Sequence, residues 1–410
     1  MSGGLPLSEA QDAPSAGPLA GCVVVDLSRA LAGPHAGMLL GDLGARVIKV
    51  EVPGRGDDSR HWGPPFMGPA DDPISTYFLS CNRNKESVTA DLKTDDGRRF
   101  VEELAARADV LIENFRPGTL DRLGLGVERL HQVNPSLVVL SISGFGPDGP
   151  EGQRAGFDQI AQGEAGLMSV TGPPGEPTKV GVPIADLLAG LHGALGVVAA
   201  IAERHHTGRG QVVRTSLLAS VAATLAFQGT RATVAGEVPT GEGNAHPAIA
   251  PYGSFAAPDA TIQIAVGSQS SWRTFAGLVG IDPDDPRYVT NRERVRHRGE
   301  LTADIETRLA ARPAAEWLKR LADAGIPAGR VRTVDEVFEW EQTRSQGLVV
   351  TVHHPVLGPV ELPGPALRFG DLPYAGGRDH HQPPPTLGQH DESVRAWIDA
   401  TPPRTAPGTP

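Results

Sequence analysis

The sequence contains few of the features that mark disulfide-stabilised, metal-binding or nucleic-acid-binding proteins. It has two cysteines in 410 residues, Cys22 and Cys81, and no CxxC or HExxH spacing of the kind that binds zinc. Cys22 begins an apolar run, which favours a buried free thiol over a disulfide. A net charge of -11 argues against the basic face that nucleic acids require, but it allows a local basic pocket for a small anion. We expect no metal site and no nucleic-acid partner.

Long apolar runs and targeting signals are also scarce. No uninterrupted apolar run reaches the about 20 residues that cross a bilayer. The first 20 residues lack a basic segment followed by an apolar one, which argues against a secretory signal. We therefore expect a cytoplasmic protein with no membrane partner.

Glycine and proline, by contrast, are plentiful, which predicts many turns along the chain. Residues 1–18 and 401–410 are rich in small residues and proline, which predicts a disordered arm and a disordered tail. In the first half, short apolar strands alternate with helices, which predicts a parallel sheet covered on both faces. The predicted strands are 22–27, 46–50, 110–113, 137–142 and 211–216, and the predicted helices are 36–43, 98–107, 123–133 and 186–204.

The pattern changes after about residue 225, where a loop-rich stretch precedes a strand pair. Helices around Trp272 and Trp317 follow the pair, which predicts a smaller α+β domain. We therefore expect a large α/β domain interrupted by a small one. The expected limits are 19–225 for the first part of the large domain, 226–330 for the small domain, and 331–400 for the return to the large domain.

Two segments combine polar side chains with turns suited to phosphate. The turn Ala32-Gly33-Pro34 lies between a predicted strand and helix, but it contains no G-x-G-x-x-G, which argues against a nicotinamide or flavin site. Its backbone N–H groups are still suited to phosphate, and an ordinary βαβ unit explains the pattern equally well. Asn82 to Ser87 offers two cations and two amides either to phosphates or, as a solvated loop, to water.

Two further segments place reactive groups where α/β proteins bind ligands. Glu113 to Gly118 ends a predicted strand with an amide, a ring and a guanidinium, and ligands of open sheets lie beyond such ends. A surface turn is the alternative interpretation. Asp186 opens an apolar, glycine-rich helix, and a carboxylate there is either an N-cap or a nucleophile that attacks a thioester. Gly181 and Gly190 would leave room for the acyl group.

Together these segments resemble the class III CoA-transferase family, which includes formyl-CoA transferase, carnitine CoA-transferase and α-methylacyl-CoA racemase. The resemblance extends from about residue 20 to about residue 395. It is carried by residues 27–34 (LSRALAGP), 41–51 (GDLGARVIKVE), 82–85 (NRNK), 113–118 (ENFRPG), 166–186 and 387–390 (LGQH). It implies an open, Rossmann-like α/β large domain built from both chain ends, a smaller α+β domain, and two chains interlocked in a homodimer.

The resemblance also implies CoA transfer through a covalent intermediate on Asp186. No metal or organic cofactor would be needed, because each step exchanges acyl derivatives of similar energy. The residues implied for CoA binding are Ala32, Lys93, Asn114, Phe115 and Arg122.

A finer resemblance points to succinyl-CoA-dependent dicarboxylate CoA-transferases, such as succinate–hydroxymethylglutarate CoA-transferase. It is carried by residues 56–60 (GDDSR), 61–66 (HWGPPF), 75–78 (STYF) and 244–246 (NAH). A second substrate carboxylate needs a fixed cation, preferably a guanidinium. Arg29 is the first candidate, and the candidate substrate-binding set is completed by Arg60, His61, Phe157 and His246.

Two alternatives are a racemase-like isomerase and a noncatalytic acyl-CoA-binding protein. A racemase needs paired acid and base groups beside the thioester. Phe157 stands where the family's racemases have a histidine, and residues 266–272 contain no carboxylate. A binding protein would lose the nucleophile, whereas Asp186 is present. We therefore predict transfer of CoA between an acyl-CoA and small carboxylic acids.

Overall fold

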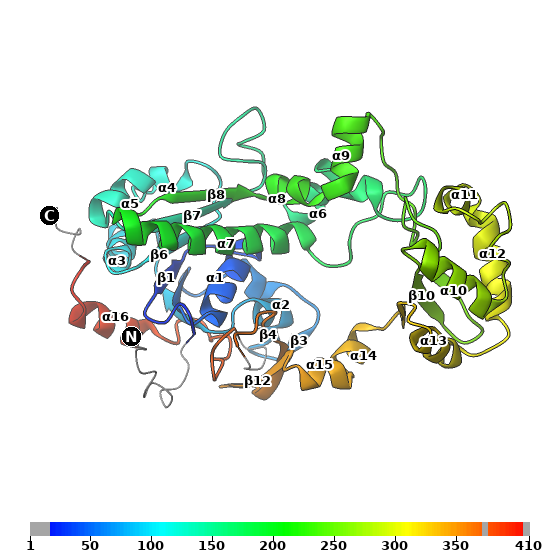
Figure 1. Cartoon of the computed structure of the whole chain (residues 1–410). Helices are drawn as coiled ribbons and strands as arrows, with labels where there is room; N and C mark the ends of the chain where they lie inside the picture. The colour runs from blue at the N-terminus through cyan, green and yellow to red at the C-terminus, as the bar shows by residue number, and fades with distance from the viewer. Residues whose placement is uncertain (1–16, 371–375, 405–410) are drawn as a thin grey trace, which may run out of the picture. The chain divides into compact units, whose positions relative to one another are not determined.

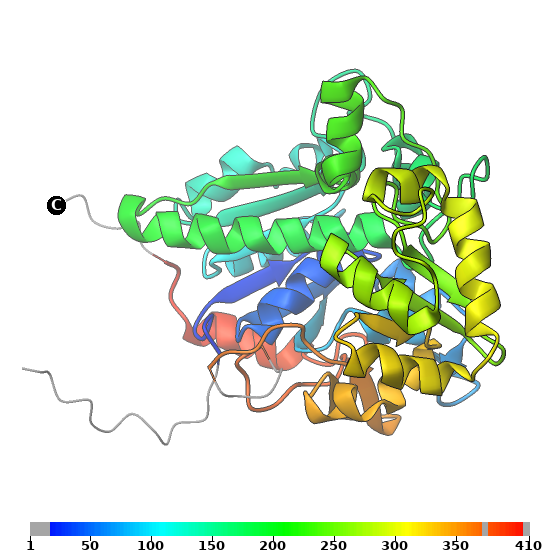
Figure 2. The same ribbon diagram turned by 45° about the vertical axis from the view of Figure 1, so that its right-hand side comes forward.

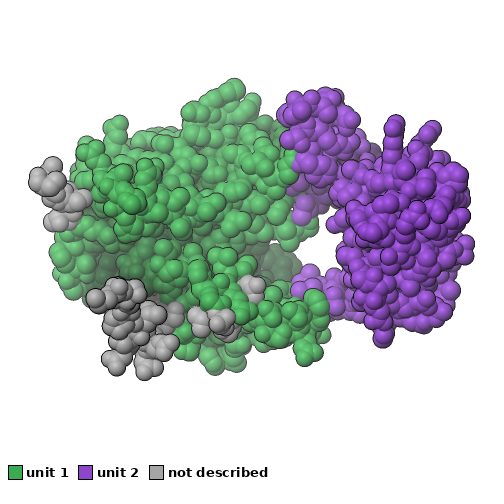
Figure 3. Space-filling view, in the orientation of Figure 1, with its two compact units in different colours: residues 1–165, 181–226, 338–410 green, residues 166–180, 227–337 purple. Residues whose placement is uncertain are grey.

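The computed structural model describes residues 17–370 and 376–404, which divide into two compact units (Figure 3). The first unit therefore contains segments from both ends of the chain. The second unit contains residues 166–180 and 331–337, which the expected limits had assigned to the large domain. The first unit comprises 1–165, 181–226 and 338–410, and the second comprises 166–180 and 227–337.

The two predicted terminal segments lie mostly outside the described residues. Of the expected arm, only residues 17 and 18 are described, and of the expected tail, residues 401–404. Arg404 contacts the large unit, because its guanidinium donates to Oδ2 of Asp109 at 2.5 Å.

A six-stranded parallel sheet forms the centre of the first unit (Figure 1). Every neighbouring pair of strands is parallel. In chain order the strands run 3-2-1-4-5-6, so the chain leaves the middle of the sheet in opposite directions from β1 and β6. The expected α/β fold with a parallel sheet is confirmed. In spatial order the strands are β5 (Lys85–Thr89), β2 (Arg46–Glu51), β1 (Val23–Asp26), β6 (Val110–Glu113), β7 (Val138–Ser143) and β8 (Val212–Ser216).

Helices cover both faces of this sheet, because its strands are apolar on both sides. On one face, side chains such as Ile48 and Leu111 pack against α3 (Asp95–Ala105), α4 (Thr119–Arg122), α5 (Val127–Val133) and α16 (Asp391–Ala400). On the other face, α1 (Ala32–Asp42) and α7 (Ile184–Thr207) lie side by side (Figures 1 and 2). Smaller elements complete the unit: a 3₁₀ helix (Asp58–His61), β3 (Phe66–Met67), β4 (Ile74–Ser75), α2 (Thr76–Ser80), α6 (Asp158–Glu164), α8 (Leu217–Thr224), α15 (Glu341–Ser345), β12 (Val349–His354) and β13 (Gly358–Pro363).

Helix α7 corrects the expectation that no segment is long and apolar enough to cross a membrane. It has 24 residues, and its most apolar window has a mean hydropathy of 1.9. Length and composition alone are weak evidence for a span, because core helices of soluble proteins have the same character. In this structure α7 packs against α1, β7 and β8. Gly193 and Gly196 face the side chains of Leu140 and Val213, so close packing on the sheet accounts for the small residues.

The edge strand β5 is covered by His390 and by Asp391, the first residue of α16. The His390 N–H donates to the Ser87 carbonyl at 2.9 Å, and the Ser87 N–H donates to Nδ1 of His390 at 3.1 Å. The Thr89 N–H donates to Oδ1 of Asp391 at 2.6 Å. The backbone groups of an otherwise open sheet edge are therefore satisfied by residues close to the end of the chain.

The second unit is an α+β assembly around its own core. An antiparallel sheet in the order β11–β10–β9 packs on helices through residues such as Trp272 and Trp317. The predicted strand pair and the helices around these two tryptophans are confirmed. The elements are a 3₁₀ helix (Leu167–Val170), β9 (Tyr252–Ala256), β10 (Thr261–Ala265), α10 (Gln269–Val279), α11 (Asn291–Arg296), α12 (Arg298–Leu309), α13 (Ala314–Asp323) and β11 (Ala328–Arg330); α9 (Ala226–Ala235) and α14 (Val334–Glu339) span the limits between the units.

Two helix predictions were wrong in detail. Of the predicted helix 123–133, only residues 127–133 are helical, as α5, because Gly124 adopts a left-handed φ of 74° that interrupts helical geometry after α4. Residues 228–235 are helical within α9 instead of loop-like. None of the α9 side chains is fully buried, so the sequence has no apolar face that would predict a helix here. Its glycine and β-branched residues also have low helix propensity, which favoured a loop.

Candidate active site

The turn between β1 and α1 lies where the strand order reverses, beside the end of β6. The Arg29 N–H donates to Oδ1 of Asn114 at 2.8 Å, and the Asn114 amide donates back to the Arg29 carbonyl at 2.7 Å. The Arg29 guanidinium lies 5.6 Å from the centre of the Phe115 ring. Ala32 begins α1 in the same turn. Four predicted residues therefore meet at the position where open α/β sheets bind ligands.

Buried charges hold this turn in place. Ala30 has a left-handed φ of 66°, and its N–H donates to Oδ1 of Asp57 at 3.0 Å. The Lys49 ammonium lies 2.8 Å from Asp57, and the Lys85 ammonium lies 2.9 Å from Asp26. Burial opposes ionisation of Asp57, but Lys49 outweighs it and lowers the Asp57 pKa to about 2. The buried ion pairs therefore fix the conformation of the turn.

The polar segment beginning at Asn82 belongs to this internal network. Asn82, Arg83 and Lys85 are all buried, and Arg83 forms a two-pronged ion pair with Asp42 at 2.8 and 2.5 Å. Both interpretations from the sequence, a solvated loop and an open phosphate site, are therefore wrong. Its cations are occupied by carboxylates inside the protein, which the sequence pattern alone does not reveal.

Asp186 lies in the first turn of α7, but it does not cap the helix. The N-cap position is Pro183, and the capping carboxylate comes from Asp158 at the start of α6. Oδ1 of Asp158 accepts the Ala185 N–H at 2.8 Å and the Asp186 N–H at 3.4 Å. The N-cap interpretation of Asp186 is therefore wrong. Its carboxyl group is not used to cap α7.

The surroundings of Asp186 disfavour its charged form. Burial, and then the nearby carboxylate of Asp158, raise the Asp186 pKa to about 7. On the neighbouring α2, burial and then Asp186 raise the pKa of Tyr77 to about 12. A carboxyl group with a strongly shifted pKa at a helix start is typical of a functional site.

An apolar cluster adjoins this carboxyl group. Leu187, the residue after Asp186, packs against buried residues of α1 and the segment after α2: Leu31, Met38 and Cys81. Both cysteines, Cys22 and Cys81, are free thiols, as predicted, but Cys22 is only half-buried and not buried as we expected. Gly190, one turn further along α7, does not leave room for an acyl group as we expected. A side chain there would meet the Ala32 carbonyl at 2.7 Å, so this glycine instead allows α1 and α7 to approach.

We predict that Gly190→Ala destabilises the protein by about 1–3 kcal/mol, because backbone atoms of α1 would have to move. The closest obstacle is the Ala32 carbonyl oxygen, which cannot rotate away as a flexible side chain would. Urea unfolding would measure the change. Gly277→Ala in α10 is the matched control, because nothing lies within 4 Å of its added carbon. We expect Gly277→Ala to be neutral or stabilising, and equal losses in both variants would contradict the packing argument.

The remaining CoA-binding candidates, one on a loop and one at the end of a helix, are exposed residues of the first unit. Lys93 follows β5, and its N–H donates to Oδ1 of Asp91 at 2.9 Å. Arg122 ends α4, where its guanidinium donates to the Thr119 hydroxyl at 2.8 Å. Both side chains are exposed at the carboxyl-end side of their strands, so neither is committed to the buried network.

The other substrate-binding candidates have different surroundings. Arg60 forms a two-pronged ion pair with buried Glu51, with both distances 2.7 Å. His61 bonds the Arg55 carbonyl at 2.9 Å. Phe157 is 67% exposed and directly precedes Asp158. His246 belongs to the second unit, where it stacks between Phe227 and Tyr252 at ring-centre distances of 5.9 and 5.0 Å.

Asp158 is the functional candidate that sequence reasoning missed. It appeared within the segment Arg154 to Asp158, whose interest lay in the missing histidine at Phe157. A capping role across 27 residues of sequence leaves no local pattern. The only available signal was an aspartate at the start of a short helical stretch.

Comparison with known proteins identifies the family of this chain. The model of CoA-transferase family III matches residues 19–391. The chain is 40% identical to succinyl-CoA:glutarate CoA-transferase of Mus musculus over 93% of this chain and 87% of that protein. It is 39% identical to succinate–glutarate CoA-transferase of Agrobacterium fabrum, over 93% and 96%. A crystal structure of a CaiB/BaiF family protein from Brucella suis superimposes with a TM-score of 0.83 at 40% identity, covering 93% and 100%. This chain therefore belongs to CoA-transferase family III and is an enzyme of the CaiB/BaiF type.

Proposed function

We propose that this enzyme moves CoA from succinyl-CoA to a second small dicarboxylic acid through a covalent intermediate on Asp186. The observation that carries the proposal is a partly buried carboxyl group of raised pKa, freed from capping by Asp158, in a chain of this family. Succinyl-CoA and glutarate appear in the name of the similar mammalian protein, and succinate and glutarate in the name of the bacterial one, which supports the substrate class.

The proposed reaction proceeds by four acyl exchanges. The Asp186 carboxylate attacks the thioester carbonyl of succinyl-CoA, giving a mixed anhydride and CoA thiolate. The thiolate attacks the aspartyl carbonyl, which releases succinate and leaves CoA on Asp186 as a thioester. The acceptor carboxylate attacks this thioester and releases the thiolate again. The thiolate then attacks the acceptor acyl group and regenerates Asp186, so bonds and charges balance without a metal or organic cofactor.

CoA is proposed to lie along the turn beside β6, with Ala32, Asn114 and Phe115 nearest the switch point. Lys93 and Arg122 would provide exposed cations for its phosphates, and Arg29 would bind the second carboxylate of the acceptor bidentately. Arg29 suits this role because its backbone is fixed by Asn114 while its side chain is only half-buried. Arg60 suits it less, since Glu51 already neutralises its charge.

A matrix of donors and acceptors tests this substrate class. Purified enzyme would be mixed with succinyl-CoA or acetyl-CoA and with glutarate, malate, formate or acetate, and each new thioester would be identified by mass. Rapid transfer from succinyl-CoA to a dicarboxylate with weak transfer to acetate or formate is expected. Preference for monocarboxylates would overturn the dicarboxylate assignment. A racemase would instead exchange the proton beside the thioester carbonyl, but Phe157 cannot transfer a proton.

We predict that kcat/KM falls about tenfold per pH unit below about pH 7, because only ionised Asp186 is nucleophilic. Removing the neighbouring charge in Asp158→Asn should shift this acidic limb to lower pH, while the asparagine oxygen still accepts the Ala185 N–H. Asp158→Ala also removes the cap and should lower kcat in addition. The pH profiles of the three proteins would be compared, and an unshifted limb in Asp158→Asn would refute the electrostatic role of Asp158.

The proposed working unit is a cytoplasmic homodimer. Apolar side chains at one-turn spacing along α7 favour such an association: Leu191 and Leu195 are 52% and 65% exposed, and Val198 continues the stripe. We predict that Leu195→Glu shifts the sedimentation coefficient towards that of a monomer, because a charge would be buried in the interface. Leu367→Glu, at a similarly exposed leucine of the first unit, is the control. An active monomer of the unmodified protein at low concentration would contradict the dimer.

A further inference from the structure

A cavity of about 680 Å³ lies in the first unit, apart from the environment of Asp186. It is bounded by the 3₁₀ helix at Arg60, by α2 at Phe78, and by the end of β12 at His354. Its walls include none of the residues that cap Asp186 or form the apolar cluster around Leu187. The volume is in the range of small-molecule sites, which is about 300–1,000 Å³.

His354 presents a fixed hydrogen-bond donor to this cavity. The residue is 3% exposed, and its Nδ1 accepts the N–H groups of Val356 and Leu357 at 3.1 and 3.3 Å. Because Nδ1 is an acceptor, the ring proton must be on Nε2. Burial, and then Arg60, lower the pKa of His354, so the ring is neutral near pH 7. Within residues 17–370 and 376–404, Nε2–H of His354 has no hydrogen-bond acceptor. The Nε2 atom is not fully buried, so a ligand in the cavity can reach it.

Arg60 supplies a second hydrogen-bond donor to the cavity, although its positive charge is largely neutralised by Glu51. Its Nε and Nη2 are bonded to Glu51, and its guanidinium stacks 3.6 Å from the centre of the Phe78 ring. Its Nη1 has no acceptor in the part of the chain that the structure describes. The other lining arginine, Arg55, is paired with Asp58 at 2.7 Å, and Asp72 adds a negative charge to the lining. The cavity therefore offers hydrogen-bond donors to one anionic group. It has no excess positive charge that would bind a second anionic group.

We infer that this cavity binds a small monocarboxylic acid with a hydrocarbon body. Its carboxylate accepts hydrogen bonds from Nε2–H of His354 and from Arg60, and the hydrocarbon lies against Ile74, Phe78 and Val356. A dicarboxylate fits less well, because Arg55 is already paired with Asp58 and Asp72 would repel the second charge. The site is an addition to the proposed transfer reaction and does not depend on it, since no residue of the cavity takes part in the steps on Asp186.

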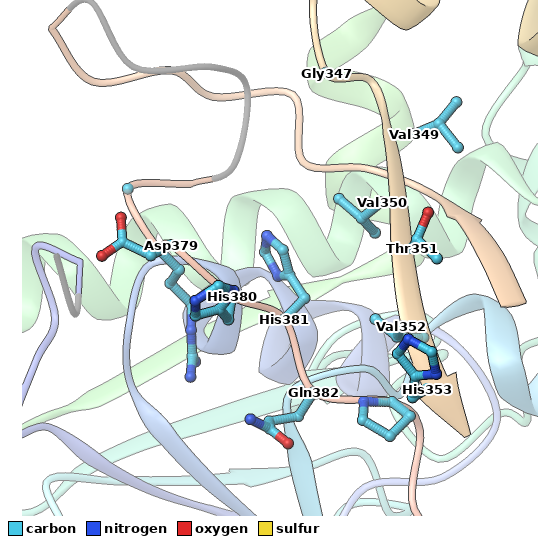
Figure 4. A pocket seen from close by; sticks show the side chains of 13 residues that line it. Gly347, Val349, Val350, Thr351, Val352, His353, Asp379, His380, His381 and Gln382 are labelled. Carbon is cyan, nitrogen blue, oxygen red and sulfur yellow. The ribbon is translucent and has the colours of Figure 1, made fainter. Parts of the chain in front are cut away.

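Hexanoate is a suitable probe, and its binding can be measured by titration calorimetry on the full-length protein. We expect binding to the unmodified enzyme and equal binding to Asp186→Asn, in which transfer is disabled. His354→Asn should weaken binding about tenfold or more, because the asparagine oxygen can still accept the backbone N–H groups while the Nε2–H donor is lost. His353→Asn is the matched control. His353 lines a different cavity with residues 377–383, at the end of β12 (Figure 4).

Val356→Trp offers a second test that leaves the His354 acceptor in place. The larger ring should fill the cavity and abolish hexanoate binding, and thermal unfolding would verify that the variant is folded. Glutarate should bind at this site more weakly than hexanoate. The inference is overturned if the unmodified enzyme does not bind hexanoate, if His353→Asn and His354→Asn weaken binding equally, or if binding is lost in Asp186→Asn. Loss in Asp186→Asn would locate hexanoate at the catalytic centre and leave the proposed transfer reaction intact.

Discussion

Asp186→Asn is expected to lower kcat/KM for CoA transfer by at least about three orders of magnitude, the loss that follows removal of a nucleophile. The asparagine amide has nearly the same shape as the carboxylate, and the Asp186 N–H still reaches Asp158. The loss would therefore report chemistry and not a change of fold. Transfer from succinyl-CoA to glutarate would be followed by the mass of the new thioester.

Two controls make this result specific. Asp72→Asn removes an exposed carboxylate elsewhere in the unit and should leave transfer unchanged. Asp186→Ala excludes activity that arises from slow conversion of the asparagine back to aspartate. Incubation of the unmodified enzyme with succinyl-CoA should also leave a covalent mass on Asp186. Turnover near the normal rate in Asp186→Ala would contradict the assignment of Asp186 as the nucleophile.

Lys85→Met is expected to destabilise the protein by about 3–5 kcal/mol, the cost of leaving a buried charge without its partner. The Lys85 ammonium is fully buried, and it donates to Asp26 at 2.9 Å, to the Pro34 carbonyl at 2.7 Å and to Asn82 at 2.9 Å. Burial opposes the ionised form of Asp26, yet Lys85 and then Lys49 hold its pKa below the usual range. Without Lys85, this carboxylate would lose its nearest cation. Urea unfolding would measure the change in free energy.

The neighbouring ion pair between Arg46 and Glu86 provides the control. It joins β5 to β2 at 2.8 Å, whereas Lys85 joins β5 to β1 through Asp26, and both side chains of the Arg46–Glu86 pair are partly exposed to water. Glu86→Gln should cost no more than about 1 kcal/mol, as is typical of solvated pairs. If the two substitutions had the same effect, burial could not be the reason for the importance of Lys85.

The regular part of the large unit could be predicted because its strands carry strong local signals. The runs at Val23, Val110 and Val138 are apolar on both faces, and only a sheet covered on both sides buries such strands. Asp186 was singled out as the candidate nucleophile because a carboxylate opening an apolar helix is unusual, and the resemblance to a family implied a role for it. The second unit was recognised from its change of pattern, although residues 166–180 join it from a distant part of the chain.

Contacts between distant segments could not be predicted. Arg83 is buried because it pairs with Asp42, about 40 residues earlier, and nothing in the local pattern indicates that pairing. Gly190 was assigned to substrate access, whereas its neighbour is the backbone of α1. Asp158 was passed over because its partners lie 27 and 28 residues away. In each case the missing information was the tertiary position of a partner and not the chemistry of the residue.

The cover over β5 has a consequence for how the protein is made. Thr89 and the carboxylate that caps it are 302 residues apart, so the ribosome produces the strand long before its cover. During synthesis, the nascent chain would present an unpaired sheet edge to any other extended polypeptide. We therefore expect the nascent protein to depend on chaperones that shield this edge until residues 390 and 391 have been synthesised.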